Sequence, residues 1–298
     1  MFRRAFTMIE LVFVIVVMGI LSKFGVEFLA QAYNSFIFSS INNSLQARSE
    51  VALETIATKL QFRIKDSAIA RDPTAAGLAG VQGVAGANLG AAATVLEWVG
   101  RDVDSLRGGA LPLWSGIIDL DIVTTTATSL DSPATNTGGI SALIGFLSNA
   151  GSGINDAALF FTGSDSDVLT GYGWDGNPIT TQNFAMHPIR GNGAFFIPVD
   201  GATGLDNTFA GTDVSEYYKL SWTAYAVVHN VANGDLTLFY DYQPWRGENF
   251  LADGQSSLIM ENVETFKFTG VGSIIKLQVC VNSNLVEDYS LCKEKTVF

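Results

Sequence analysis

A nearly unbroken apolar run close to the amino terminus limits what this chain can fold into more than any other feature. Residues 6–21 contain one charged side chain, Glu10, and they come directly after Arg3 and Arg4. As a helix rising about 1.5 Å per residue, residues 6–30 extend about 37 Å and can cross the roughly 30 Å hydrocarbon core of a bilayer. The basic residues precede the run, so the positive-inside tendency places the amino terminus in the cytoplasm and exports the chain beyond the helix.

Glu10 is the unusual residue of this run. An isolated ionised carboxylate inside a bilayer costs at least ~2.5 kcal/mol, so its presence calls for a partner or a function. The natural partner is an amine, and cleavage just before Phe6 would create one, in the same chain or on a neighbouring subunit. An ordinary signal anchor gives no reason for a carboxylate at this position.

The segment Arg4-Ala5-Phe6-Thr7-Met8-Ile9-Glu10-Leu11 closely resembles the processing signal of type IV pilins and type II secretion pseudopilins. The resemblance implies that a prepilin peptidase cuts between Ala5 and Phe6, that the new amine of Phe6 is methylated, and that Glu10 matches a neighbouring subunit's amine during assembly. Two positions depart from the common pattern, because Ala5 replaces a glycine and Glu27 stands where many major pilins have proline. The second departure favours a pseudopilin or a minor pilin.

This resemblance also implies a location, partners and a function. The expected protein is a non-enzymatic structural subunit of the bacterial inner membrane, with a cytoplasmic amino terminus and a periplasmic head, which assembles as a minor component of a type II secretion pseudopilus. Its expected partners are the prepilin peptidase, other pilin or pseudopilin subunits in a homo- or heteropolymer, and the inner-membrane assembly platform. Two alternatives stay open: a minor pilin of a type IV pilus used in adhesion, motility or DNA uptake, and a membrane-tethered extracytoplasmic binding module.

Composition argues against several other classes of protein. Lys and Arg total 17 against 29 Asp and Glu, and a net charge of -12 repels a phosphate backbone, so we expect no nucleic-acid partner. Two cysteines and two distant histidines, His187 and His229, do not have metal-ligand spacing. Neither a Gly-x-Ser-x-Gly elbow nor a phosphate-binding Gly-x-x-x-x-Gly-Lys-Ser/Thr loop occurs, so we expect neither an enzyme nor a cofactor other than calcium.

The fold is expected to be α+β, with a long amino-terminal helix, transmembrane in its first half and amphipathic in its second, packed on an antiparallel β-sheet head. Apolar residues at spacings of four and seven between Ile41 and Ile64 predict the amphipathic half. Asp72 before Pro73 predicts that this helix stops near Arg71. The predicted division is a leader (1–5), a transmembrane and polymerisation helix (6–30), an amphipathic helix (31–72), an Ala/Gly-rich connector (73–94) and a β-rich periplasmic head (95–298).

Local patterns predict the elements of the head. Asn233-Gly234 lies between two alternating segments and suits the positive φ angles of a hairpin turn. A second pair of strands is expected to be joined across residues 270–272. The predicted strands are 95–99, 117–123, 157–162, 217–228, 236–242, 258–268 and 274–281, and a short helix is predicted over 140–147.

The two cysteines, Cys280 and Cys292, lie near the carboxyl terminus. An exported head is in an oxidising compartment, so we expect them to form a disulfide, which resembles the carboxyl-terminal disulfide of many type IV pilins. The alternative is a pair of reduced, buried cysteines.

A Gly- and Asp-rich loop over residues 163–177 contains Asp165, Asp167 and Asp175. Carboxylate oxygens are the ligands that calcium prefers, so these three residues are the candidate calcium site. The EF-hand pattern fails because Leu169 occupies the third ligand position. The alternative is a solvated acidic loop.

Overall fold

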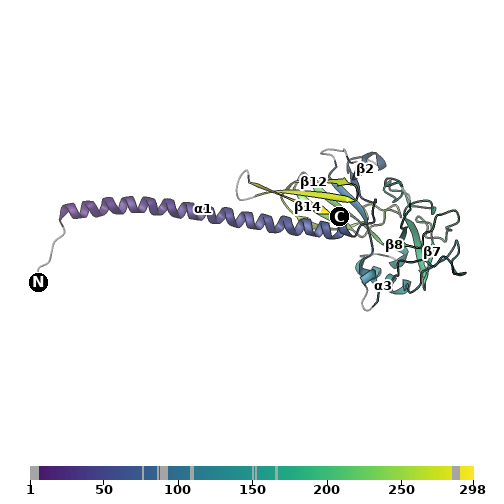
Figure 1. Cartoon of the computed structure of the whole chain (residues 1–298). Coiled ribbons are helices and arrows are strands. Elements are labelled where there is room, and N and C mark those ends of the chain that lie inside the picture. The colour runs from purple at the N-terminus through teal and green to yellow at the C-terminus, as the bar shows by residue number, and fades with distance from the viewer. Residues whose placement is uncertain are drawn as a thin grey trace.

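The computed structural model describes residues 7–75, 77–85, 87, 93–107, 111–149, 151, 153–164, 167–283 and 289–298. One long helix, α1 (Met8–Gln61), begins near the amino terminus and carries a β-rich head around and beyond its carboxyl end (Figure 1). Every strand pair in the described parts of the head is antiparallel. The expected α+β fold, with a long apolar amino-terminal helix and antiparallel sheets, is therefore confirmed.

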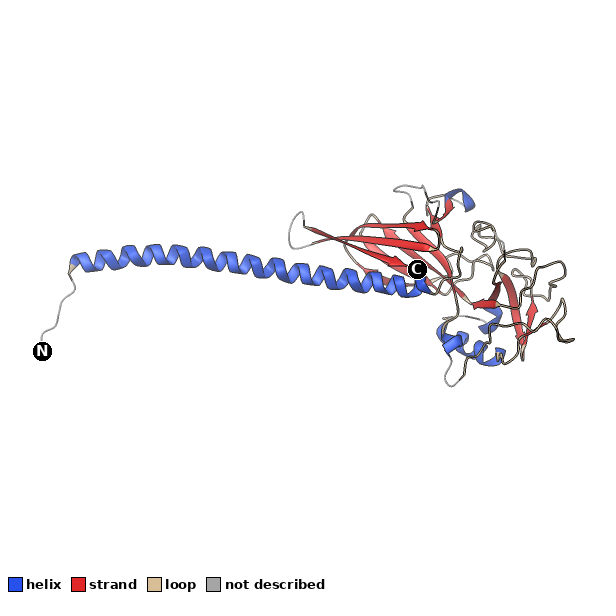
Figure 2. Cartoon of the chain, in the orientation of Figure 1, coloured by secondary structure: helices blue, strands red, loops and turns tan. Residues whose placement is uncertain are grey.

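Two sheets lie beside the second half of α1, as the red strands of Figure 2 show. The first has six strands in the order β11-β10-β9-β3-β1-β2, and the second has three in the order β12-β13-β14. Their bounds are β1 (Ile69–Arg71), β2 (Val81–Gly83), β3 (Val95–Gly100), β9 (Thr223–Asn230), β10 (Asp235–Tyr240), β11 (Gln255–Met260), β12 (Val263–Val271), β13 (Ile274–Asn282) and β14 (Ser290–Val297).

One hydrophobic core joins α1 to both sheets. Leu53, Ile56 and Leu60 of the helix are at most 2% exposed, and they belong to one cluster with Trp98 of β3 and Leu277 of β13. The spacing of three to four residues puts these apolar side chains on one helical face, which is why this half of α1 is buried on one side only. Helix and sheets therefore form one packed unit.

A third sheet lies farther from the amino terminus and has the strand order β4-β7-β6-β5-β8. Its strands are β4 (Leu130–Asp131), β5 (Ala158–Phe161), β6 (His187–Asn192), β7 (Phe195–Pro198) and β8 (Tyr218–Ser221). The helices near it are α2 (Asp104–Arg107), α3 (Thr137–Leu147) and the 3-10 turn η3 (Gly153–Asp156), while another 3-10 turn, η1 (Gly77–Gly80), precedes β2. Ile140 and Ile144 of α3 pack with the sheet in a separate hydrophobic core.

This third sheet belongs to an insertion between two neighbouring strands. β3 and β9 are hydrogen-bonded partners, and their pairing ends with Gly100 opposite Thr223. The chain therefore leaves the six-stranded sheet after β3 and returns next to the same point. We call residues 101–222 the inserted lobe, and Figure 1 shows its labelled elements α3, β7 and β8 at the end of the molecule opposite the amino terminus.

The expected helix end near Arg71 is wrong, because α1 stops at Gln61. The backbone N–H of Ile64 donates to the carbonyl of Val99 at 2.9 Å, and Ile69–Arg71 form β1, which pairs with β3. Asp66 has a φ of 65°, which turns the chain between the helix and this strand. Ile64 thus continues the apolar spacing of the helix in sequence but is buried against the sheet.

Three predicted strands also differ from the structure. The segment 217–228 is divided at Trp222 into β8 and β9, which belong to different sheets. Residues 117–123 contain only one bridge, between Ile117 and Tyr217, and the segment 258–268 is divided into β11 and β12. The second break falls at Asn262, whose φ of 61° interrupts extended backbone. The hairpin at Gly234, which has a φ of 76°, is confirmed, as is the helix that ends at Leu147. Part of the expected connector 73–94 is ordered as η1 and β2.

Candidate functional site

The first half of α1 makes almost no contact with the head. We call residues 8–40 the stalk; none of its residues is buried, and Ile41 is the first buried residue of the helix. Its most apolar stretch has a mean hydropathy of 2.3, and none of that stretch is buried. By length and composition α1 can therefore cross a membrane.

The stalk is longer than a bilayer requires. At about 1.5 Å per residue its length is about 50 Å, whereas the hydrocarbon core is about 30 Å thick. The part nearest the head contains Phe28, Tyr33 and Phe36, which are 65–70% exposed. No charged residue occurs between Glu27 and Arg48. Exposure of several large aromatic side chains on an uncharged helix segment is unfavourable in water and calls for a protein partner.

Glu10 has a hydrogen-bonding partner within its own chain. Its Oε2 accepts hydrogen bonds from the backbone N–H of Thr7 at 2.9 Å and from the Thr7 hydroxyl at 2.8 Å. Thr7 is the N-cap of α1, so the carboxylate helps to close the first turn of the helix. Glu10 therefore has a role even in a plain anchor, contrary to the expectation from the sequence. Ala5 and Phe6 lie outside the described residues, so cleavage and pairing with an amine stay predictions.

Ion pairs from β14 hold the second half of α1 against the head. Lys293 binds Glu50, and Lys295 binds Glu54 with Nζ 2.5 Å from the carboxylate oxygen. The hydrogen bond from Lys293 lowers the pKa of the Glu50 carboxyl, and the hydrogen bond to Glu54 raises the pKa of Lys295. Alternate residues of β14 face the helix, so the strand and the helix align along this contact.

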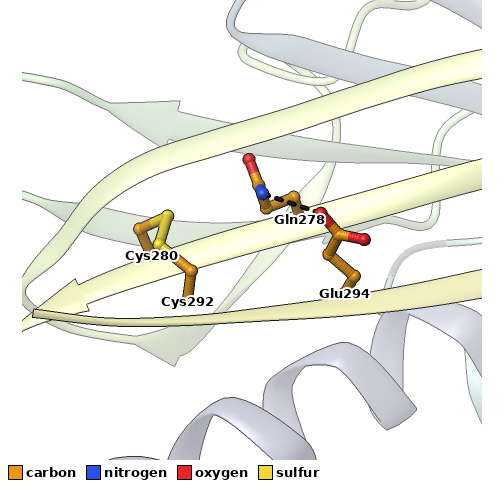
Figure 3. The surroundings of a disulfide bond; sticks show 4 residues. All are labelled: Gln278, Cys280, Cys292 and Glu294. Atoms are coloured by element: carbon orange, nitrogen blue, oxygen red, sulfur yellow. Dashed lines mark hydrogen bonds between the residues drawn. A yellow bond between two sulfur atoms is a disulfide. The ribbon is translucent and has the colours of Figure 1, made fainter.

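The expected disulfide between Cys280 and Cys292 is confirmed. The two residues are direct partners on β13 and β14, with Cα atoms 4.0 Å apart. Figure 3 shows the bond on the same pair of strands as the hydrogen bond from Gln278 to Glu294, at 2.9 Å. Lys293 and Lys295 alternate with Cys292 and Glu294 along β14, so the disulfide lies on the sheet face opposite α1. It fixes the strand that carries the two helix-binding lysines.

The candidate calcium ligands bind backbone groups of their own loop. Asp167 accepts hydrogen bonds from the N–H groups of Leu169 and Thr170, and Asp175 accepts one from that of Asn177. Among the described residues no group of three or more His, Cys, Asp or Glu side chains could hold a metal ion. Asp165 lies outside the described residues, so the complete three-carboxylate site stays a prediction.

Sequence reasoning missed a buried polar network in the head. Glu97 of β3 is 2% exposed, and its carboxylate binds Arg71 Nε at 2.7 Å and the Tyr242 hydroxyl at 2.9 Å. Burial raises the pKa of the Glu97 carboxyl, and Arg71 and Tyr242 oppose that increase. A glutamate within a predicted strand was the signal available from the sequence. The network joins β1, β3 and the segment after β10.

The two histidines and three of the tryptophans are buried in the head. His187 lies on β6, where burial lowers its pKa to about 3 and its ring contacts Gln182. His229 Nε2 lies 2.9 Å from the carbonyl oxygen of Val263. Trp174, Trp222 and Trp245 are buried, as expected for core residues.

Comparison with known proteins adds no relative. No protein-family model, no curated protein and no solved structure matches this chain.

Proposed function

We propose that this chain is a prepilin-like subunit that is cleaved between Ala5 and Phe6 and assembles through its stalk into a type II secretion pseudopilus, as a minor component. The observation that carries the proposal is the length of the uncovered stalk. It exceeds the bilayer by about 20 Å, at about 1.5 Å per residue, and the excess segment is uncharged and exposes several aromatic side chains. A filament of parallel stalks would bury this segment.

A simple membrane tether fits the stalk less well. Such an anchor needs about 20 apolar residues and can then continue as a polar linker. Residues 28–36 instead present Phe28, Tyr33 and Phe36 to solvent outside the span that a bilayer covers. A minor pilin of a type IV pilus would use the same contacts and is the alternative within this class. The inserted lobe enlarges the head well beyond the packed unit of helix and sheets, which supports a minor component.

Substitutions at Glu10 test whether assembly uses its charge. Glu10→Gln keeps hydrogen-bond acceptors for the helix cap but removes the charge, whereas Glu10→Ala removes both. We expect both variants to insert into the membrane and both to be absent from sheared filaments. Thr7→Val is the matched control, because it removes the Thr7 hydroxyl and keeps the Glu10 charge, and it should assemble. Normal incorporation of Glu10→Gln would show that Glu10 serves only as a cap.

Mass spectrometry tests the processing step independently. Protein extracted from membranes that contain an active prepilin peptidase should begin at Phe6 and carry a methyl group on its amine. Recovery only of chains that begin at Met1 would contradict the proposal.

A further inference from the structure

A groove runs along α1 where the buried half of the helix begins, between the helix and the ends of β11 and β13. It consists of two cavities of 370 and 440 Å³, both lined by Arg48, Met260 and Glu261. Because they share these residues, the two cavities lie next to each other along the helix. The helix side of this groove includes the small residues Ser40, Ser44 and Ala47, which leave room for bulky side chains of another molecule.

The charges in this groove lack partners in the described parts of the chain. Arg48 and Glu261 take part in none of the ion pairs found there. The same is true of Lys23 and Glu27, which are exposed one helical turn apart on the stalk. The groove thus has one positive and one negative group, and the stalk has a complementary pair.

We propose that this groove binds the stalk of a second copy of the chain, with Glu27 of that copy at Arg48 and Lys23 at Glu261. The inference rests on the proposed function, since it names a contact through which assembled subunits recognise one another. Two copies placed one above the other are enough to form it. The contact can therefore form when the chain is a minor component of the filament.

The direction of the helices agrees with this pairing. Both copies insert with the same orientation, so their helices are parallel and Lys23 lies one turn closer to the membrane than Glu27. In the groove, Glu261 lines the cavity beside residues 40–48 as well as the one beside residues 47–51. Ile259 lines only the cavity beside residues 47–51 and Asn262 only the one beside residues 40–48, so the chain around Glu261 runs toward the membrane past Arg48, as the pairing with Lys23 requires.

Apolar side chains of the stalk fit the same register. Ile20, Phe24 and Phe28 form an exposed row with a spacing of four residues, next to the row that carries Lys23 and Glu27. With Glu27 level with Arg48, Phe24 lies level with Leu45, next to the small side chain of Ser44. The aromatic rings would then occupy the groove while the two ion pairs fix the axial position.

This register has a consequence for the membrane. Positions 27 and 48 differ by 21 residues, so the second copy is displaced outward by about 32 Å at about 1.5 Å per residue, close to the thickness of the hydrocarbon core. Two subunits that are both fully inserted in the bilayer cannot make this contact. The groove therefore accepts a stalk only after that stalk has left the membrane, and the contact helps to hold an extruded subunit in place.

Cysteine cross-linking tests the contact in the complete chain. Glu27→Cys and Arg48→Cys variants are co-expressed with the prepilin peptidase and the assembly machinery, and disulfide-linked dimers are measured in sheared filaments and in membranes. The native cysteines do not interfere, because they are bonded to each other. We expect the mixed 27–48 dimer in filaments and not in membranes. Each variant expressed alone is the control for contacts between copies at equal height.

Charge reversal gives a second measurement. Arg48→Glu and Glu27→Arg should each lower the filament fraction by about tenfold or more, since like charges at an interface are costly. The double variant should restore most of it, and an unchanged melting temperature of the head would show that folding is intact. Where wild-type filaments form, filaments of the two co-expressed cysteine variants without the 27–48 dimer, or a double charge-reversal variant no better than the single ones, would overturn this inference alone. Absence of wild-type filaments would overturn the proposed function as well.

Discussion

The two halves of α1 belong to one continuous helix but are stabilised in different ways. In the second half, Ile56 and Leu60 are fully buried against the sheets, and Glu50 and Glu54 bind lysines of β14. In the first half, Ile15 is 62% exposed and Phe28 is 70% exposed, and the described residues of the chain bury neither. The head buries the apolar side chains of the second half, whereas those of the first half need a bilayer or another subunit to cover them.

This difference separates folding from assembly. Substitutions in the buried half should change the free energy of unfolding of the head. Substitutions in the stalk should instead change how the folded protein binds the bilayer or another subunit. A head that unfolded more readily after a stalk substitution would argue against the separation.

The largest effect on stability is expected from Ile56→Ala. Its side chain is fully buried between α1 and the sheets, so the cavity should lower the free energy of unfolding by about 2–5 kcal/mol. Ile15→Ala is the matched control and should leave that free energy unchanged, because Ile15 lies on the exposed stalk. Denaturant unfolding in detergent, followed by tryptophan fluorescence, measures both. Equal losses of unfolding free energy in the two variants would contradict the difference between the two halves of α1.

Removal of the disulfide should have a similar or slightly smaller effect. Cys280→Ser with Cys292→Ser releases the loop that precedes β14, at a cost of about 3 kcal/mol in the chain-entropy model. Because β14 carries the lysines that bind α1, hydrogen exchange should also rise in residues 50–54 of the helix and not in the stalk. Unchanged exchange in residues 50–54 would show that the helix is held without β14.

The smallest effect is expected from the ion pairs between α1 and β14. The pKa of Glu50 is lowered in the folded protein, so its contribution to stability is present above the unfolded pKa and is lost as the pH falls through the folded pKa. The pKa of Lys295 is raised, so its contribution is present below the unfolded pKa and is lost as the pH rises through the folded pKa. Glu50→Gln should flatten the acid side of the stability curve, and urea midpoints measured across pH would show it.

The sequence predicts well those features that local chemistry determines. The apolar run predicts the helix, Gly234 predicts the hairpin, and the expected export of the head predicts the disulfide; all three elements are present. The helix and the hairpin depend on residues that are close together in the sequence, whereas the disulfide was predicted from the expected compartment of the whole head.

Features that depend on distant contacts were missed. Pro73 shows only where a helix cannot continue, whereas the end at Gln61 is set by the hydrogen bond between Ile64 and Val99 and by the pairing of β1 with β3. The pattern of residues 117–123 predicts a strand, but the segment forms only a single bridge, between Ile117 and Tyr217. The insertion of residues 101–222 is visible only once β3 and β9 are seen to be neighbours.

Accessibility of the stalk just outside the bilayer shows whether another subunit covers it. A cysteine in place of Phe36, which is 70% exposed, can be labelled with a membrane-impermeant maleimide in cells with and without the assembly machinery. A cysteine in place of Val123, which is 89% exposed on the inserted lobe, is the control and should be labelled in both. Assembly through the stalk predicts that position 36 is labelled in unassembled protein and protected in filaments. Equal labelling of position 36 in both preparations would contradict it and indicate a simple tether.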